Sequence, residues 1–137
     1  MTSRRSLSRS FGLIAGFALV AGASAVRSDL SQETSITEGL IAVGIAYEIG
    51  EQCSSINARV LMGISYLNQL KSEAQSLGYY DADINAYVDN DAEQDRLEAI
   101  ARGRLADLGA VSGQAETYCT VGLAQIEQQT VAGQLLR

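Results

Sequence analysis

Apolar residues recur every three or four positions along most of the chain after residue 34, and this spacing predicts amphipathic helices. No segment rich in β-branched residues alternates apolar and polar positions over five residues, so the strand signal is weak. The chain has no proline, which permits long helices, and glycines mark where the helices end. We therefore predict an all-α fold, a small irregular bundle of four to five helices that forms a single domain over residues 26–137.

The first predicted helix begins at a capping box, Ser35-x-x-Glu38, and runs to about Cys53. Its centre, Leu40–Tyr47, is apolar on all sides, which is typical of a buried helix. Small residues recur at every fourth position along this helix, and they would let another helix approach closely. These residues are Ala42, Ala46 and Gly50.

The later helices are predicted over residues 57–77, 81–88, 92–108 and 115–136, and Gly78 and Gly109 end two of them. We expect Asp81 to cap the short helix and Asp89-Asn90-Asp91 to cap the one after it. The three longer helices carry apolar residues at helical spacing, which we expect to face the core. These residues are Val60, Gly63, Leu67, Leu70, Ala74 and Leu77, then Leu97, Ala101, Leu105 and Leu108, then Cys119, Leu123 and Ile126.

Residues 1–25 have the pattern of a secretory signal peptide: a basic start, an apolar run over Phe11–Ala23 and a small-x-small site at Ala23-Ser24-Ala25. Cleavage is expected between Ala25 and Val26. The apolar run is shorter than the ~20 residues that a membrane-spanning helix needs, so we expect no permanent anchor. Ser3-Arg4-Arg5-x-Leu7 resembles a twin-arginine signal, so this route and the general secretory route are both open. Both predict a periplasmic or secreted protein, and a mitochondrial transit peptide is a further alternative.

The composition excludes several classes of function. Without histidine there is no His-based catalytic triad and no His-ligated metal or haem, and we expect no cofactor. Beyond residue 25, 7 basic residues stand against 16 acidic ones, a net charge of −9. This charge disfavours binding to nucleic acid or to anionic lipid, because both need clustered Lys and Arg. We expect an unidentified protein partner in the cell envelope.

Cys53 and Cys119 are the most informative pair of residues. An even number of cysteines in an exported protein predicts a disulfide. The bond would tie the end of the first helix to the start of the last. Free or catalytic thiols are the alternative, although the Cys-x-x-Cys spacing of redox pairs is missing.

Acidic residues are concentrated between residues 81 and 98, where only Arg96 opposes them. An EF-hand is excluded, because a loop from Asp81 would have Ala86 and Ala92 where Gly and Glu are needed. Two interpretations remain: a solvated face that stabilises helix N-termini, or a weak site for a divalent cation or a basic partner. The residues of that candidate site are Asp81, Asp83, Asp89, Asp91, Glu93 and Asp95.

Two further features could carry chemistry. Glu48 and Glu51 lie beside an apolar segment, where a carboxyl group could act as a general acid, but Glu48 could also pair with an Arg or Lys of another helix. Tyr79-Tyr80, in a predicted turn, could present an aromatic ring to a partner.

Taken together, these features predict a non-enzymatic interaction or structural protein. The alternatives are an acid-stress holdase chaperone and a His-free enzyme that uses carboxylate and tyrosine chemistry.

Several stretches, taken in order, resemble a family of small secreted alphaproteobacterial proteins described only as a domain of unknown function. The stretches are Ile41-Ala42-Val43-x-Ile45-Ala46-x-Glu48-Ile49 before Cys53, Tyr66-Leu67-x-x-Leu70-Lys71, Leu77-Gly78-Tyr79, Ala86-Tyr87-Val88, Tyr118-Cys119-x-x-Gly122-x-x-x-Ile126 after Gly113, and Gly133-x-Leu135-Leu136. The resemblance covers about residues 36–137 and is weakest over 89–112. It implies an exported helical domain with paired cysteines, and it implies no activity, substrate or catalytic residue.

Overall fold

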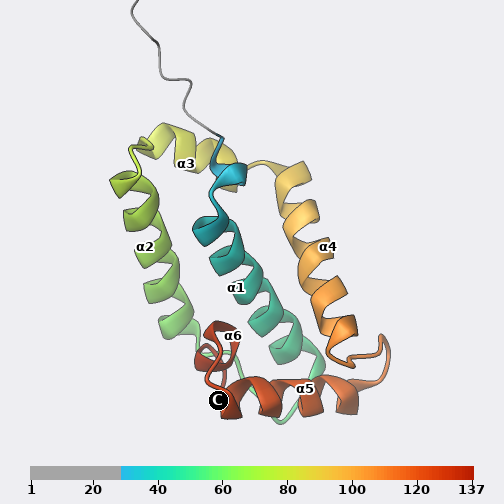
Figure 1. The fold of residues 1–137 in the computed structure, drawn as a ribbon. Coiled ribbons are helices and arrows are strands. Elements are labelled where there is room, and N and C mark those ends of the chain that lie inside the picture. The colour runs from blue at the N-terminus through green and yellow to red at the C-terminus, as the bar shows by residue number, and fades with distance from the viewer. Residues whose placement is uncertain (1–28) are drawn as a thin grey trace, which may run out of the picture.

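The computed structural model describes residues 29–137, and in this part of the chain it confirms an all-α bundle closed by one disulfide (Figure 1). A short 3-10 turn, η1, precedes six α-helices, and no strand forms among the described residues. The predicted signal peptide, residues 1–25, and its cleavage site at Ala25 and Val26 lie outside that range. The elements are η1 (Leu30–Gln32), α1 (Thr34–Gln52), α2 (Val60–Ser76), α3 (Asp81–Val88), α4 (Asp91–Asp107), α5 (Ala115–Glu127) and α6 (Val131–Gln134).

The central helix is α1, and the other helices are arranged around it. α2 and α4 stand on either side of α1, while α3 crosses one end of the bundle and α5 the other (Figure 1). The larger apolar cluster joins α1 to α4, α5 and α6, and Ile49 within it is fully buried. The smaller cluster fills the end near α3. Its buried members are Leu30, Ile36, Leu70, Ala74, Tyr79 and Ile84.

The N-terminal cap of α1 differs from the prediction. The helix begins at Thr34 with Glu33 as its N-cap residue, so the predicted capping box at Ser35 and Glu38 is wrong. The Glu38 carboxylate instead binds the guanidinium of Arg104 on α4, at 2.6 and 2.7 Å. A bidentate pair with arginine satisfies both carboxylate oxygens, which leaves neither to reach back to the helix end.

Of the N-cap residues predicted for α3 and α4, the first is wrong and the second is confirmed. Tyr80 is the N-cap residue of α3, so Asp81 is the first residue of the helix and not its cap. The Asp83 carboxylate accepts a hydrogen bond from the backbone N–H of Tyr80 at 3.0 Å. At α4 the prediction is confirmed, because the side chain of Asn90 accepts a hydrogen bond from the backbone N–H of Glu93 at 3.0 Å.

The apolar centre of α1 is largely buried, as predicted. Ile41, Ile45 and Ala46 are buried, but Tyr47 at its end is exposed. Of the three small residues, Ala46 belongs to the cluster that joins α1 to other helices and Ala42 packs against it, whereas Gly50 meets a different neighbour. A Cβ placed on Gly50 would lie 3.4 Å from Ala58, which belongs to the extended segment after α1 and not to a helix.

The last predicted helix, residues 115–136, is wrong in its length. α5 ends at Glu127, Gln129 takes a positive φ of 51°, and α6 then begins after Thr130. The hydroxyl of Thr130 accepts a hydrogen bond from the N–H of Gly133 at 3.0 Å and so caps the new helix. The turn brings back apolar residues that a straight helix would have carried into solvent. The buried residues gained are Ala132, Leu135 and Leu136.

The end of the chain pairs with the segment that links α1 to α2. The backbone N–H of Asn57 donates to the carbonyl of Arg137 at 2.8 Å, and that of Arg137 donates to the carbonyl of Asn57 at 3.0 Å. The N–H of Arg59 donates to the carbonyl of Leu135 at 2.8 Å. These bonds fix the start of α2 against the C-terminus.

The disulfide between Cys53 and Cys119 is confirmed, with 5.1 Å between the two Cα atoms. Cys53 is the C-cap residue of α1 and is fully buried, and Cys119 lies near the start of α5. The bond therefore holds the end of the central helix to the helix that crosses beneath it.

The predicted stripe on α2 is mostly wrong. Only Leu70 and Ala74 are buried, whereas Val60, Leu67 and Leu77 are exposed. A Cβ on Gly63 would meet no atom within 4 Å. The reason is that α2 lies at the side of the bundle and packs on α1 and α3 through its second half.

The stripes on α4 and α5 are correct in part. On α4, Ala101 and Leu105 are buried and Leu108 is exposed. On α5, Leu123 is exposed, and Gly122 faces α1 in its place. A Cβ on Gly122 would lie 2.7 Å from the Ile49 side chain, so this glycine lets α5 approach α1 closely.

Candidate functional site

The first half of α2 presents an apolar surface to solvent. We call it the α2 face and define it by four side chains, which are Val60 (68% exposed), Leu61 (83%), Ile64 (52%) and Leu67 (41%). Residues three, four and seven apart share one side of a helix, so these side chains gather on one side of α2. No charged residue occurs between Val60 and Leu70. Contiguous exposed apolar patches are typical of surfaces that bind other molecules.

The α2 face continues into an apolar cavity of about 250 Å³, which we call the α2–α3 groove. Leu67 belongs to both the face and the groove, and Val88 on α3 forms part of the opposite wall. Lys71 and Asp89 also line the groove and give it one charge of each sign. The remaining apolar lining residues are Leu30, Ile36, Leu40, Leu70, Ala74, Ile84 and Tyr87.

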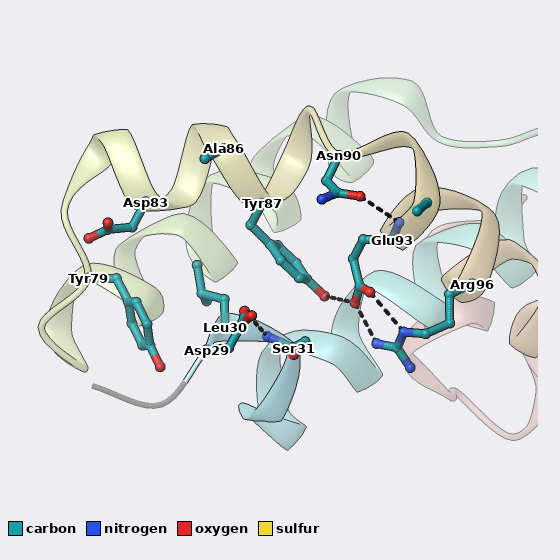
Figure 2. Close-up of a pocket in the computed structure, with 11 residues that line it drawn as sticks. Asp29, Leu30, Ser31, Tyr79, Asp83, Ala86, Tyr87, Asn90, Glu93 and Arg96 are labelled. Atoms are coloured by element: carbon teal, nitrogen blue, oxygen red, sulfur yellow. Dashed lines mark hydrogen bonds and ion pairs between the residues drawn. The ribbon is translucent and has the colours of Figure 1, made fainter. Parts of the chain in front are cut away.

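A larger and more polar cavity of about 740 Å³ lies between η1, α3 and the start of α4 (Figure 2). The phenol of Tyr87 points across it and donates a hydrogen bond to Oε1 of Glu93 at 2.7 Å. The other oxygen of Glu93 accepts a hydrogen bond from Nε of Arg96 at 2.9 Å. Tyr87 lies on α3, so this chain of bonds links α3 to α4.

The protonation states of this group are fixed by its surroundings. Burial and the bond to Glu93 raise the pKa of Tyr87, while the bonded Arg96 lowers the pKa of Glu93. Glu93 in turn raises the pKa of Arg96. Each shift moves a pKa further from neutrality, whereas a general acid or base needs a pKa near the working pH. The group therefore acts as a tie between two helices and is poorly suited to proton transfer.

The acidic residues predicted as a cation or partner site do not form one cluster in the described part of the chain, although Asp83 and Glu93 line the same cavity. Asp81 accepts a hydrogen bond from Gln75 at 2.8 Å and pairs with Lys71 at 3.5 Å, and these two side chains lower its pKa. Asp83 is bonded to the N–H of Tyr80, and Glu93 is held as described above. Asp89, Asp91 and Asp95 occupy the α3–α4 turn and the first turns of α4. Among residues 29–137 no three acidic or cysteine side chains are grouped closely enough to hold a metal ion.

Glu48 forms an ion pair with an arginine of another helix. It lies 3.0 Å from the guanidinium of Arg102 on α4, which also pairs with Glu98 at 3.0 Å. The pairing with an arginine of another helix, foreseen as one alternative, is confirmed. With the Glu38–Arg104 pair, in which Arg104 lowers the pKa of Glu38, it ties α1 to α4 twice.

The two tyrosines of the α2–α3 turn have opposite environments. Tyr79 is buried, and its hydroxyl donates to Oε1 of Glu33 at 2.7 Å. Tyr80 is exposed, so only this one of the pair can present its ring to a partner.

Sequence reasoning missed the α2 face as a site, although one signal was present. Val60, Leu61, Met62 and Ile64 stand within five residues, and they cover more of the helix circumference than a single stripe. A helix at the side of a small bundle is covered on one side only. Some of these side chains therefore had to be exposed.

No helix among residues 29–137 is both long and apolar enough to cross a membrane. The sequence profile of a protein family, described as "Family of unknown function (DUF5333)", matches residues 28–137. Searches of curated proteins and of solved structures found no match.

Proposed function

Because the chain belongs to this family of unknown function, DUF5333, it inherits no assigned activity, and we propose from its own surface that it is a non-enzymatic interaction protein. We place it outside the cytoplasm, in the periplasm or secreted. The export-signal pattern of residues 1–25 and the disulfide support this location, since structural disulfides persist in oxidising compartments. The observation that carries the proposal is the exposed α2 face.

The α2 face is large enough to contribute to binding. Fully burying one Leu, Ile or Val side chain is worth roughly 1.5–3 kcal/mol. Four such residues, each at least two-fifths exposed, would supply a favourable term of about 4–7 kcal/mol before the cost of association. Because association itself costs at least about 4 kcal/mol, this term alone supports only weak, reversible binding.

The polar groups support interaction more than catalysis. Glu38, Glu48 and Glu93 are each engaged by an arginine, and Tyr87 is bonded to one of these carboxylates. The bonds of these four side chains join α1, α3 and α4, so each of the four side chains has a structural role. The α2 face contributes no such tie to the fold.

Site-specific photo-crosslinking in cells that export the protein tests the proposal. A photoreactive residue at Asn68, beside the α2 face, should give a covalent adduct in the envelope fraction. The matched position is Ala106, an exposed residue of α4 on the other side of α1, and it should give none. Leu61→Glu should abolish the adduct at position 68, whereas Leu108→Glu, a charge at another exposed leucine, should leave it. Equal adducts at both positions, or none at either, would contradict the proposal.

The acid-stress holdase is a second candidate, and the ion pairs favour it. Arg104 lowers the pKa of Glu38 and Arg96 that of Glu93, while Gln75 and Lys71 lower the pKa of Asp81. These contacts fail as acid protonates the carboxylates. The disulfide would keep the loosened chain compact while its core became accessible. Aggregation of a client protein brought to about pH 2–3, with and without this protein, separates the two candidates. Unchanged precipitation of the client excludes the holdase.

A further inference from the structure

We infer that the α2 face binds the α2 face of a second copy of this chain, in an antiparallel, two-fold symmetric dimer. The inference deepens the proposed function and rests on it, because it names the partner of that same surface. Two-fold dimers are the commonest homo-oligomers, and their interface uses one patch on both subunits, so the patch must be complementary to itself.

The distribution of charge favours the α2 face as a surface where two copies can meet. The described residues hold 16 acidic and 6 basic side chains, a net charge of −10, so two copies repel each other over most of their surfaces. α1, α3 and α4 carry acidic residues along their length, and α5 carries one at each end, Glu116 and Glu127. The charges of α2, Lys71 and Glu73, lie in its second half. The first eleven residues of α2, Val60–Leu70, carry no charge at all. Contact there brings no like charges together.

The two ends of the α2 face carry opposite charges, and these charges decide the orientation. Arg59, directly before α2, is exposed; its guanidinium donates to the carbonyl of Gln134 at 3.2 Å and pairs with no carboxylate among the described residues. Asp89 lines the α2–α3 groove at the other end, and its carboxylate pairs with no cation within residues 29–137. Lys71 lines the same groove but pairs with Asp81 at 3.5 Å, so Asp89 is the charge of this end that lacks an ion-pair partner among the described residues. In an antiparallel dimer each Arg59 lies at the Asp89 end of the other copy. In a parallel dimer like charges would meet at both ends.

The apolar residues fit the same arrangement. With the two-fold axis near Ile64, this residue meets its own counterpart, and Leu61 lies against Leu67 of the other copy. Leu67 lines the α2–α3 groove, so Leu61, the most exposed apolar side chain of the face, lies against the groove of the other copy in this arrangement. One end of the face thus supplies a leucine and a cation, and the other end supplies an apolar groove and an anion.

Sedimentation equilibrium of the oxidised, exported protein tests the inference. The unmodified protein should associate to a dimer, and Leu61→Glu or Ile64→Glu should weaken the association by at least about tenfold, because each change occurs twice in a two-fold interface. Leu108→Glu should leave the dimer unchanged. A dimer that survives Leu61→Glu and Ile64→Glu forms through another surface, and that result overturns the inference.

Charge exchange tests the antiparallel orientation. Arg59→Glu and Asp89→Arg should each weaken the dimer, and the variant that carries both should restore it, because the exchanged charges again face each other. A thermal melt followed by circular dichroism confirms that each variant is folded. Weakening by the single variants without restoration in the double variant overturns the antiparallel orientation.

The outcomes also separate this inference from the proposed function. If the unmodified protein is monomeric at every concentration but position 68 crosslinks to a different protein, the inference fails and the proposed function stands. If it is monomeric and position 68 gives no adduct, both fail.

Discussion

Removal of the disulfide should cost this domain a large part of its stability. The bond between Cys53 and Cys119 closes a loop across 66 sequence positions. In the chain-entropy model, restricting the unfolded chain by a loop of this length is worth about 4 kcal/mol. A small domain has a total free energy of unfolding of about 5–15 kcal/mol. The loop encloses α2, α3 and α4 entirely, so the unfolded chain is restricted over more than half of the described residues.

The perturbation is the double variant Cys53→Ala/Cys119→Ala, compared with the oxidised protein in urea. With a slope of about 1–2 kcal/mol per molar urea for a domain of this size, the loss of about 4 kcal/mol moves the midpoint down by about 2–4 M. Alanine is suitable because Cys53 is fully buried beside apolar residues, and alanine introduces no polar group there.

Reduction of the unaltered protein is the control for the substitutions. Both routes should give the same midpoint within the small cost of the missing sulfur atoms, and alkylation should label both cysteines only after reduction. A midpoint that moves by less than about 0.5 M would refute the loop-entropy reasoning, because it would mean that the unfolded chain gains little freedom when the bond is absent.

Three further predictions concern acid, packing and processing. Arginine partners lower the pKa values of Glu38 and Glu93, and Gln75 and Lys71 lower that of Asp81. The stabilising contribution of these carboxylates is present above the unfolded carboxyl pKa of about 4 and is lost as the pH falls below it, so the urea midpoint should decline from about pH 5 to pH 2; a constant midpoint would contradict this. Gly133→Ala should lower the free energy of unfolding by at least about 2 kcal/mol, because the new Cβ would lie 1.9 Å from the carbonyl oxygen of Gln125. Gly63→Ala, with open space around it, should raise the free energy of unfolding by about 0.5–1 kcal/mol, and similar effects at the two sites in urea melts would refute this reasoning. The intact mass of the exported protein should correspond to a chain that begins at Val26, and a form that keeps residues 1–25 in the membrane fraction would overturn that prediction.

The local features of the fold could be predicted from the sequence because they depend on nearby residues. Helical spacing and the glycines at 78 and 109 gave α2, α3 and α4 with boundaries within a few residues. The disulfide followed from the number of cysteines and the export-signal pattern. Asn90 was correctly placed as a cap because its bond to Glu93 spans only three residues.

The features that failed depend on contacts between distant segments. The break at Gln129 serves to pack Leu135 and Leu136 back against the core, and no local signal in residues 128–130 outweighs the helical pattern. Likewise, Leu123 was assigned to the core because its spacing is helical. The packed side of α5 is set instead by the close approach of Gly122 to Ile49, which lies 73 positions earlier in the chain.

The predicted packing stripe on α2 is wrong for the same reason, and this error bears on function because the exposed residues form the α2 face. α2 packs on the bundle through Leu70 and Ala74 in its second half, and this contact would form equally well if Leu61 and Ile64 were polar. Both side chains project into solvent, where a polar residue would avoid the cost of exposing apolar surface to water. Folding therefore does not require these residues to be apolar, and burial against a partner does. Because the rest of the chain is strongly acidic, a short uncharged surface with Arg59 at one end and Asp89 at the other limits which partner can approach and in which direction.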